Sequence, residues 1–406
     1  MKIAIVCFNL SWQSGGPRLV FSSARTLKGK GHKVVIYAPE FSGEYFKELW
    51  NELDIRVVSA PKLFQPRKSG NFLEWVKSNL ALEKLQTEIA KRIAAAIDLN
   101  SDVLNVHDFA YPTAYFFKKR NPRVRVIWTE NDPPFAYLPK GSLVASILSR
   151  IYNVWKEIKS RKYFRAIDQA AVLDLYNQAW CQKRGLKTVI TRLGVDPKFY
   201  LPVKDFKERA KTKKVRLFGL GSLNEYRRYE DTILAVRHLR DWGYDASALI
   251  IASDIWNERI YREKIQTIIK ENDLEKSINF QLKGVSEEGL RQAYEETDVF
   301  VYAMYNPPPR DGFGFSIGVF EAMAAGLPVV LCQTTTSVEV LEDKKSALFV
   351  DPMSPRQIAE KIKFLVDNPA LYQKIASAGQ KLVKNELTWD KYADRFLRAV
   401  SLADNI

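Results

Sequence analysis

Two stretches of this chain begin in the same way, and they decide the fold. Residues 2–38 read KIAIVCFNLSWQSGGPRLVFSSARTLKGKGHKVVIYA, and residues 214–252 read KVRLFGLGSLNEYRRYEDTILAVRHLRDWGYDASALIIA. Each has an apolar run typical of a buried strand, a loop with small residues, an amphipathic segment typical of a helix, a glycine turn and a second apolar run. Each stretch therefore predicts one β-loop-α-β unit.

The two units have the same internal spacing. Lys2 and Gly31 are 31 − 2 = 29 positions apart, and Lys214 and Gly243 are 243 − 214 = 29 positions apart. The chain of 406 residues is also longer than one hydrophobic core ordinarily organises. We therefore predict an α/β protein of two Rossmann-like, doubly wound domains with mainly parallel sheets. A single α/β domain that contains several such units is the alternative.

Further apolar runs continue the alternation of strands and helices. They are DVLNVHDF (102–109), RVRVIWTEN (123–131), ASALIIAS (246–253), SINFQLKG (277–284), DVFVYAMY (298–305), LPVVLC (327–332) and ALFVD (347–351). Doubly wound domains bind ligands beyond the carboxyl ends of their strands. We therefore expect the two domains to face each other across a ligand-binding cleft.

The predicted domain limits follow from the positions of these runs. We expect a first domain at residues 1–200, a second at 201–386, and a C-terminal helix at 387–406 that packs back on the first domain. The segment at 188–202, with its glycine and two prolines, predicts the end of the first domain and a linker. The charged run KDFKERAKTKK at 204–214 is expected to complete that linker.

The charge of the chain indicates an anionic partner. The net charge is +15 and the pI is about 9.4, which favours nucleic acid, a phosphate-rich ligand or an acidic membrane surface. The basic residues are not grouped with the stacking aromatics of a nucleic-acid-binding module, so we do not expect nucleic acid.

The cysteines and the apolar runs bear on location. Cys7, Cys181 and Cys332 are widely spaced and odd in number, which fits neither a disulfide framework nor a metal site, so a reducing, cytoplasmic location is expected. We expect neither a signal peptide nor a transmembrane helix, because no apolar run is long enough.

Small residues stand at two predicted strand-to-helix junctions. Gly15 and Gly16 follow the first strand, and Gly312 and Gly314 flank Phe313 before the helix in FGFSIGVFEAMAAGLPVV. Small residues let the backbone approach a phosphate, and the N-terminus of a helix offers free N–H groups and a positive dipole end. Glycines of ordinary turns are the alternative explanation.

Three charged side chains in the second half are candidates for ligand contacts. Arg227 and Arg228 follow the first strand of that half, and two guanidinium groups there could bind a diphosphate. A solvent-exposed pair that forms a salt bridge with Glu230 or Asp231 at the helix start is the alternative. Glu321 is a lone carboxylate in an apolar helix, which needs a hydrogen-bonding partner. The hydroxyls of a ribose could supply it, or local backbone or a nearby arginine could.

Polar residues end two predicted strands of the first half. His107 and Asp108 end one strand, and Asn131 and Asp132 end the next, so all four are expected to point into the ligand-binding cleft. His107 is either a contact to a bound acceptor or a core residue with its hydrogen bonds satisfied.

The segment at 141–167 combines apolar and basic residues. Its apolar positions at helical spacing are Leu143, Ile147, Ile151, Val154 and Ile158. From residue 140 to 165 there are seven Lys and Arg against one acid, Glu157. This composition is typical of a helix that lies on an anionic membrane surface. A solvated basic helix packed on the core is the alternative.

Over nearly its whole length the chain resembles the retaining glycosyltransferases of GT-B fold in family four, the glycosyl transferases group 1. The segments that carry the resemblance are KGVSEEGLRQAYEETDVFVYAMY (283–305), DGFGFSIGVFEAMAAGLPVV (311–330) and TTTSVEVLEDKKSALFVDP (334–352). In that family a Glu-x7-Glu motif follows a Gly-Phe-Gly loop, and its second glutamate, here Glu321, binds the ribose of the nucleotide. The resemblance implies an acceptor-side first domain and a second domain that binds the nucleotide-sugar.

The resemblance also assigns roles around the donor. Arg227, with Arg228 adjacent, matches the basic residue that contacts the donor diphosphate, and Lys283 begins the turn against which the base lies. The loop at 312–316 (Gly312, Phe313, Gly314, Phe315 and Ser316) and the first-domain Gly15 and Gly16 match segments that approach the donor. In this assignment Arg227, Arg228, His107 and Asp311 are the candidate catalytic residues.

Three positions depart from the family pattern. Phe313 stands 321 − 313 = 8 positions before Glu321, where the family has glutamate, and the nearest acid is Asp311. Either the helix entry holds two extra residues and Asp311 replaces that glutamate, or the sugar-binding acid is missing. Ser222 stands where the family has arginine, and Asn131 stands where it often has histidine.

The resemblance implies transfer of a sugar, with retention, from a UDP- or GDP-linked donor to a hydroxyl of a glycan or lipid-linked acceptor. It implies no cofactor and no metal, and a place in glycan biosynthesis. A cytoplasmic protein, peripheral on the cytoplasmic face of the membrane, is the location that fits. The alternative is a catalytically silent GT-B-fold subunit that supports an active partner, which the missing first glutamate favours.

Overall fold

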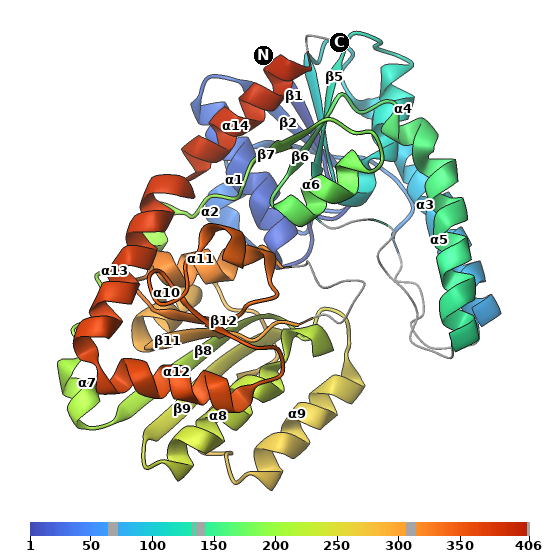
Figure 1. Ribbon diagram of the computed structural model, residues 1–406. Helices are drawn as coiled ribbons and strands as arrows, with labels where there is room; N and C mark the ends of the chain where they lie inside the picture. The colour runs from blue at the N-terminus through green and yellow to red at the C-terminus, as the bar shows by residue number, and fades with distance from the viewer. Residues whose placement is uncertain (64–71, 132–133, 135–142, 306–313, 404–406) are drawn as a thin grey trace. The chain divides into compact units, whose positions relative to one another are not determined.

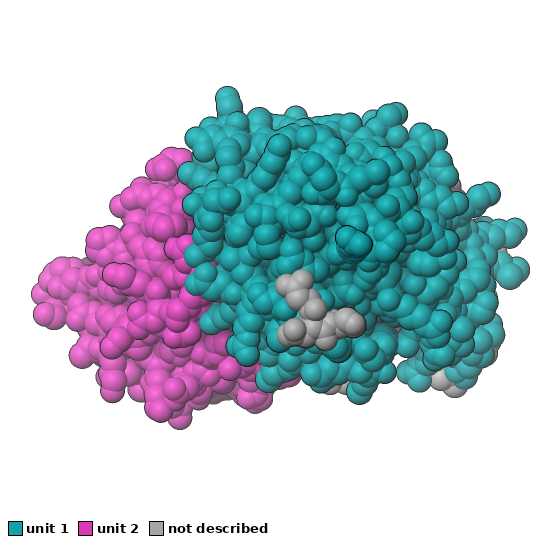
Figure 2. All heavy atoms as spheres, turned by 90° about the horizontal axis from the view of Figure 1, so that it is seen from above, with its two compact units in different colours: residues 1–192, 392–406 teal, residues 193–391 magenta. Residues whose placement is uncertain are grey.

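The computed structural model describes residues 1–63, 72–131, 134, 143–305 and 314–403. Its contacts divide the chain into two compact units, which Figure 2 colours separately. Unit 1 comprises Met1–Arg192 with Tyr392–Ile406, and unit 2 comprises Leu193–Lys391. The division therefore falls eight residues before the limit we placed after residue 200, because 200 − 192 = 8.

Unit 1 is built on a parallel sheet. In the part that the structure describes, seven strands are ordered β3-β2-β1-β4-β5-β6-β7. The strands are β1 (Lys2–Val6), β2 (Lys33–Ala38), β3 (Asp54–Val57), β4 (Val103–His107), β5 (Arg125–Glu130), β6 (Gln169–Val172) and β7 (Thr188–Ile190). Its helices are α1 (Gly15–Gly29), α2 (Lys47–Trp50), α3 (Phe72–Ala96), α4 (Pro112–Lys118), α5 (Leu143–Phe164) and α6 (Leu175–Gln182). Unit 1 also includes α14 (Trp389–Leu402) from Tyr392 onward.

Unit 2 has a second parallel sheet of the same type. Within the described residues, six strands are ordered β10-β9-β8-β11-β12-β13. They are β8 (Lys214–Ser222), β9 (Asp245–Ser253), β10 (Ile278–Gln281), β11 (Val299–Tyr302), β12 (Val329–Cys332) and β13 (Leu348–Val350). The helices are α7 (Lys207–Lys211), α8 (Tyr229–Asp241), α9 (Arg259–Glu271), α10 (Glu287–Glu296), α11 (Ile317–Ala324), α12 (Pro355–Asp367) and α13 (Pro369–Glu386).

The two sheets share one strand order, and helices flank both of them (Figure 1). In each, the chain runs outward through three strands and then returns to the other side of the first one. The order reverses between β1 and β4 in unit 1 and between β8 and β11 in unit 2. Ligands of open α/β sheets bind beyond the carboxyl ends of the strands at this switch point. The prediction of two doubly wound α/β domains is confirmed.

The repeated β-loop-α-β unit corresponds to β1-α1-β2 and β8-α8-β9. Gly31 and Gly243, the glycines used to align the two units, have φ angles of +84° and +81°. Each lies just after the end of a helix in the left-handed region, where glycine carries no Cβ penalty.

The segment predicted to complete a linker is part of the folded core of unit 2. The run at 204–214 contains α7, and Phe206 just before that helix is fully buried. Its ring stacks on Tyr372 of α13, with a centroid distance of 4.2 Å and an interplanar angle of 6°. One aromatic residue therefore anchors a stretch that is otherwise strongly charged.

The helix predicted at 141–167 is α5, and its inner face packs on unit 1. Tyr152, Ser160, Tyr163 and Phe164 are buried, and Tyr163 and Phe164 contact Tyr111 at centroid distances of 6.0 and 5.4 Å. Figure 1 shows α3, α4 and α5 beside one another. None of the helices in the described ranges combines the length and the hydropathy needed to cross a bilayer.

Candidate functional site

Arg227 lies at the switch point of the second sheet. β8 ends at Ser222, and a single 3-10 turn, Glu225–Arg227, follows it. The Nη1 group of Arg227 donates a hydrogen bond of 3.0 Å to the phenol oxygen of Tyr302, the last residue of β11. Burial raises the pKa of Tyr302 while the adjacent Arg227 lowers it. A cation is therefore held beside a phenol where the two central strands end.

Two glycines, which have no Cβ, leave room for the side chains of Arg227, Tyr302 and Met304. Gly221 has a φ angle of +152°, and a Cβ there would lie 3.0 Å from Cζ of Arg227. Gly314 has a φ angle of +117°, and a Cβ there would lie 2.8 Å from Sδ of Met304 and 3.2 Å from the phenol oxygen of Tyr302. A side chain at either position would be strained and would displace a neighbour.

The entry to α11 is fixed by a serine from elsewhere in unit 2. Oγ of Ser337 donates to the Gly314 carbonyl at 2.9 Å and accepts from the Ser316 amide at 3.1 Å. Phe315, between them, is buried and packs on Phe320 at 4.8 Å. The other predicted members of this loop, Asp311, Gly312 and Phe313, lie outside the described residues.

Arg228 has different partners from Arg227. Its φ angle of 54° places it in the left-handed region, and its guanidinium group binds the Asp231 carboxylate at 2.8 and 3.0 Å and Glu230 at 3.0 Å. This is the helix-start salt bridge that the sequence left open as an alternative. The structure therefore does not bring the two arginines together as one guanidinium pair.

Glu321 is buried in α11, where only 1% of its surface is exposed. The phenol of Tyr294 in α10 donates to Oε2 of Glu321 at 3.1 Å and also lies 3.3 Å from the Gly318 carbonyl. Tyr294 is itself packed edge-on against Phe218 of β8 at 5.2 Å. The partner of this lone carboxylate thus includes a tyrosine from a neighbouring helix, which neither of the predicted explanations had named.

Two further donor-site candidates of unit 2 are Ser222, the last residue of β8, and Lys283, which follows β10. Oγ of Ser222 accepts a hydrogen bond of 3.0 Å from Nδ2 of Asn224, just after β8. Lys283 is exposed in the loop after β10, and β10 is the edge strand that pairs with β9. Ser222 is therefore at the switch point with Arg227, whereas Lys283 follows the edge strand.

In unit 1, His107 is a buried, neutral group at the end of β4. Nε2 accepts from Nδ2 of Asn105 at 3.1 Å, and Oδ1 of Asn105 accepts from the Thr129 hydroxyl at 2.9 Å. In that arrangement Nδ1 carries the ring proton, and it has no hydrogen-bond partner among the described residues. Burial lowers the pKa of His107 to about 3. The imidazole therefore stays uncharged at neutral pH.

Asp108 and Asn131 directly follow β4 and β5, which are neighbours in the sheet, and their side chains are in contact. Oδ1 of Asp108 accepts from the backbone amide and from Nδ2 of Asn131, both at 3.0 Å, and Nδ2 of Asn177 donates to the Asn131 carbonyl at 2.8 Å. Burial raises the pKa of Asp108 to about 6, although the hydrogen bonds from Asn131 oppose that shift. Asp132 lies outside the described residues.

Gly15 and Gly16 begin α1, beyond the carboxyl end of β1. A Cβ built at Gly16 would meet no atom of the described chain within 4 Å, apart from adjacent backbone. The first turn of the helix contains no acidic residue. Packing in unit 1 therefore does not require glycine at position 16, and the N-terminus of the helix keeps its positive end uncompensated by carboxylates of its own first turn.

Several residues that shape the site in unit 2 were not predicted from the sequence, among them Tyr302, Gly221 and Tyr294. Tyr302 and Gly221 shape the position of Arg227, and Tyr294 binds Glu321. Tyr302 ends a strand that we predicted, so its place at the switch point could have been inferred. Tyr294 carries no such signal, because it lies on a different helix, 27 positions before Glu321 and on the other side of β11 in the sequence.

Comparisons with known proteins find a family model that matches part of this chain. Residues 202–382 match the model of the family described as "Glycosyl transferases group 1". The sucrose synthase of Melioribacter roseus is 30% identical over 124 residues, which is 30% of this chain and only 15% of that relative. The phosphatidyl-myo-inositol mannosyltransferase of Mycobacterium leprae is 23% identical over 401 residues, covering 98% of this chain and 96% of the relative.

Solved structures show the same fold over the whole chain. The crystal structure of Anabaena Alr3699/HepE in complex with UDP-glucose matches with a TM-score of 0.73 and 15% identity, and the match covers 99% of each chain. The sequence identity is low, so this likeness supports the fold. It confirms the predicted GT-B architecture of two parallel-sheet domains.

Proposed function

We propose that this chain, whose residues 202–382 match the glycosyl transferases group 1 family within a GT-B fold, is a retaining glycosyltransferase. It transfers a sugar from a nucleotide-diphosphate donor to an acceptor hydroxyl. The observation that carries the proposal is the position of Arg227, held by Tyr302 where the second sheet reverses its strand order.

Arg227 binds the donor diphosphate in this proposal. When the bond between the anomeric carbon and the diphosphate oxygen breaks, negative charge grows on the leaving group. A pre-positioned guanidinium group stabilises that charge without reorganising during the reaction. The glycine at 221 lets this group lie against the backbone, and no metal ion is part of the proposed step.

The donor nucleoside is bound by the neighbouring elements of unit 2. The carboxylate of Glu321 accepts hydrogen bonds from the ribose hydroxyls, and the hydrogen bond from Tyr294 holds it for that purpose. We propose UDP as the nucleotide, because the Anabaena structure with the same fold was solved with UDP-glucose. The acceptor oxygen attacks on the face that the diphosphate leaves, and its proton passes to a leaving phosphate oxygen, so the anomeric configuration is retained.

The acceptor is a lipid-linked or glycan hydroxyl. The relative from Mycobacterium leprae, which spans nearly the whole chain, is named for transfer to phosphatidyl-myo-inositol, and this supports a lipid acceptor. His107 at the carboxyl edge of the first sheet serves this acceptor as a neutral hydrogen-bonding group, since burial keeps the pKa of its imidazole far below neutrality.

Substitution of Arg227 tests the proposal. We expect Arg227→Ala to lower the affinity for UDP about 10- to 100-fold, the contribution of one or two charge-assisted hydrogen bonds, and to abolish turnover. The matched control is Arg237→Ala, which removes a half-exposed arginine paired with Asp241 on α8. Isothermal titration with UDP and product analysis by NMR provide the measurements. Equal UDP affinity in wild type and Arg227→Ala would remove Arg227 from the site, and an inverted product anomer would refute retention.

A catalytically silent subunit is the second candidate. Phe313 occupies the position where the family has an acid, and this substitution favours a chain that binds nucleotide but does not transfer sugar. The same titration separates the two functions. UDP binding that depends on Arg227, without release of sugar from any UDP-sugar in the presence of acceptor extracts, would establish the silent subunit.

A further inference from the structure

The outer face of α5 carries a row of exposed apolar side chains. Its members are spaced at three and four positions on one side of the helix, and each is between 50% and 61% exposed: Ile147, Ile151, Val154 and Ile158. This row is over ~16 Å long at 1.5 Å per residue. Trp155, beside the row, is 39% exposed and lies under the ammonium group of Lys159 at 3.8 Å. The inner face of the same helix packs on unit 1, so the row is a second, separate apolar surface.

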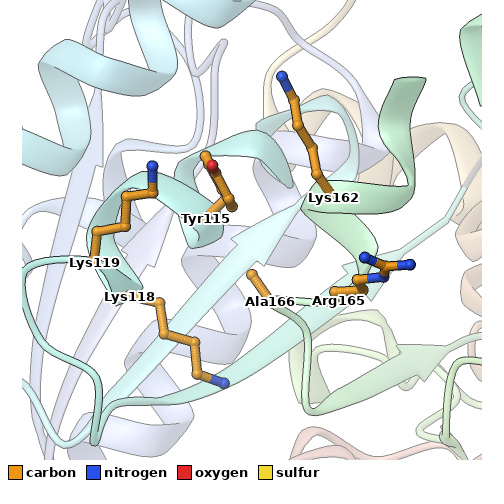
Figure 3. Close-up of a pocket in the computed structure, with 6 residues that line it drawn as sticks. All are labelled: Tyr115, Lys118, Lys119, Lys162, Arg165 and Ala166. Carbon is orange, nitrogen blue, oxygen red and sulfur yellow. The ribbon is translucent and has the colours of Figure 1, made fainter. Parts of the chain in front are cut away.

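The row leads along the helix into a basic pocket. One turn after Ile158 comes Lys162, and Arg165 follows on the same side. Figure 3 shows these side chains around the pocket with those of α4. The pocket has a volume of about 370 Å³ and is lined by Tyr115, Lys118, Lys119, Lys162, Arg165 and Ala166.

Among the residues that the structure describes, one cation of this pocket has a carboxylate partner and three do not. Lys118 is paired with Asp168 at 2.5 Å. Within the described ranges, no carboxylate lies at ion-pair distance from Lys119, Lys162 or Arg165. Lys119 lies over the Tyr115 ring at 4.4 Å. The pocket therefore presents three cations to solvent beside an aromatic ring, which suits the phosphate group of a ligand.

We propose that the Ile147–Ile158 row and the basic pocket together form a docking face for an anionic lipid bilayer. The apolar row enters the boundary between headgroups and acyl chains, Trp155 lies at the interface, and the pocket binds a lipid phosphate. A helix with apolar residues on one side and lysines and arginines beside them binds such a surface in two ways. Its apolar side chains are buried among the acyl chains, and its cations are attracted to the anionic headgroups. The inference does not depend on sugar transfer.

Charge distinguishes the bilayer from a second copy of this chain as the occupant. The one acid of α5, Glu157, is bound to Arg184 at 2.7 Å, so the helix presents basic groups beside its apolar row. A symmetric dimer through this face would place the same patch of each copy against the other and bring like charges together. An anionic surface neutralises them instead.

Vesicle co-sedimentation of the full chain tests the proposal. Vesicles contain either phosphatidylcholine alone or equal parts of phosphatidylcholine and phosphatidylglycerol. We expect binding to the anionic vesicles that weakens with salt. The double variant Lys162→Gln with Arg165→Gln should lower the partition coefficient about 30-fold. The double variant Ile151→Ser with Ile158→Ser should lower it by at least about tenfold.

Matched controls in unit 2 make the same chemical changes elsewhere. Lys270→Gln with Lys276→Gln removes two exposed charges, and Ile260→Ser removes an isoleucine that is 81% exposed. These controls should bind as wild type does. Binding to neither vesicle, or equal loss in the controls and the docking-face variants, would overturn the proposal. A wild-type dimer that Ile151→Ser with Ile158→Ser dissociates, without vesicle binding, would assign the face to a second copy.

A readout on a single side chain supports the test independently of those variants. Brominated acyl chains quench tryptophan fluorescence at short range. We expect quenching of the wild-type chain on anionic vesicles, and loss of that component in Trp155→Phe. Bound protein whose quenching is the same in both chains would show that another surface contacts the bilayer.

Discussion

Arg227 and Arg228 are adjacent arginines whose side chains serve different purposes because the backbone turns between them. Arg227 closes a 3-10 turn and contacts Tyr302, whereas Arg228 has a left-handed φ angle of 54° and binds Asp231 and Glu230. A left-handed residue other than glycine, asparagine or aspartate is unusual, and surrounding contacts must maintain it. The ion pairs of Arg228 stabilise the start of α8, and this leaves Arg227 as the cation of the switch point.

His107 gives unit 1 a defined dependence on pH. Its pKa is lowered to about 3 in the folded state, so the stability that its neutral form contributes is complete above the unfolded value of 6.5 and is lost as pH falls toward 3. We expect wild type to lose about 2 kcal/mol more unfolding free energy than His107→Gln between about pH 7.5 and about pH 5. Urea unfolding at the two pH values measures this difference.

The ionisation of Asp108 gives stability the opposite dependence on pH. Asp108 is present in both wild type and the His107→Gln variant. Its pKa is raised to about 6, so its contribution is complete below 3.8 and is lost as pH rises through about 6. Comparing the two chains cancels this contribution. A histidine NMR resonance assigned to His107 that titrates near its ordinary pKa would contradict the prediction.

At this scale, the sequence predicted where candidate residues lie along strands but not what they contact. Asp108 and Asn131 were predicted to end strands of the first half, and they directly follow β4 and β5, but the hydrogen bonds that join them were not predicted. The contact between Tyr294 and Glu321 had no local pattern to reveal it, because it joins two helices through the tertiary fold. The roles of the donor-site residues remain predictions.

Among the elements, α7 is the one whose sequence is most misleading. Its surroundings are strongly charged, yet Phe206 is buried against Tyr372. We expect Phe206→Ala to lower the unfolding free energy of unit 2 by about 3–5 kcal/mol, as for other buried phenylalanines. Urea unfolding followed by circular dichroism measures the change.

Lys211→Ala in the same helix is the control, because that lysine side chain is 71% exposed. Its effect should stay within about 0.5 kcal/mol. If the two variants unfolded alike, α7 would be the linker that its charge first indicated.

The strands were predicted from the sequence more accurately than α7 was. Apolar runs bounded by glycines and polar residues marked β4, β5 and β9 through β13, because strands of a parallel sheet are buried on both faces. Short edge strands and single turns, such as β7 and the turn at Arg227, are too brief to give a periodic signal.

At the scale of the whole molecule, the two units differ in sequence continuity. Unit 2 is one continuous segment, Leu193–Lys391, with its own core and its own switch point. We expect residues 193–391, expressed alone, to fold with a single cooperative transition and to bind UDP, since Arg227, Tyr302 and Glu321 all belong to it. Calorimetry and UDP titration of this segment are the measurements. An unfolded segment, or a folded one that fails to bind UDP although the full chain binds it, would contradict this expectation.

Unit 1 is discontinuous, because α14 completes it from the far end of the chain. Tyr392 and Phe396 of that helix are fully buried, and Nη1 of Arg395 donates to the Thr191 carbonyl at 3.3 Å. On the ribosome, the domain that is made first must therefore wait for residues 392–403 to emerge before its apolar surface is covered. The domain that is made second can finish folding before it, and the nascent first domain is the one that chaperones would need to shield.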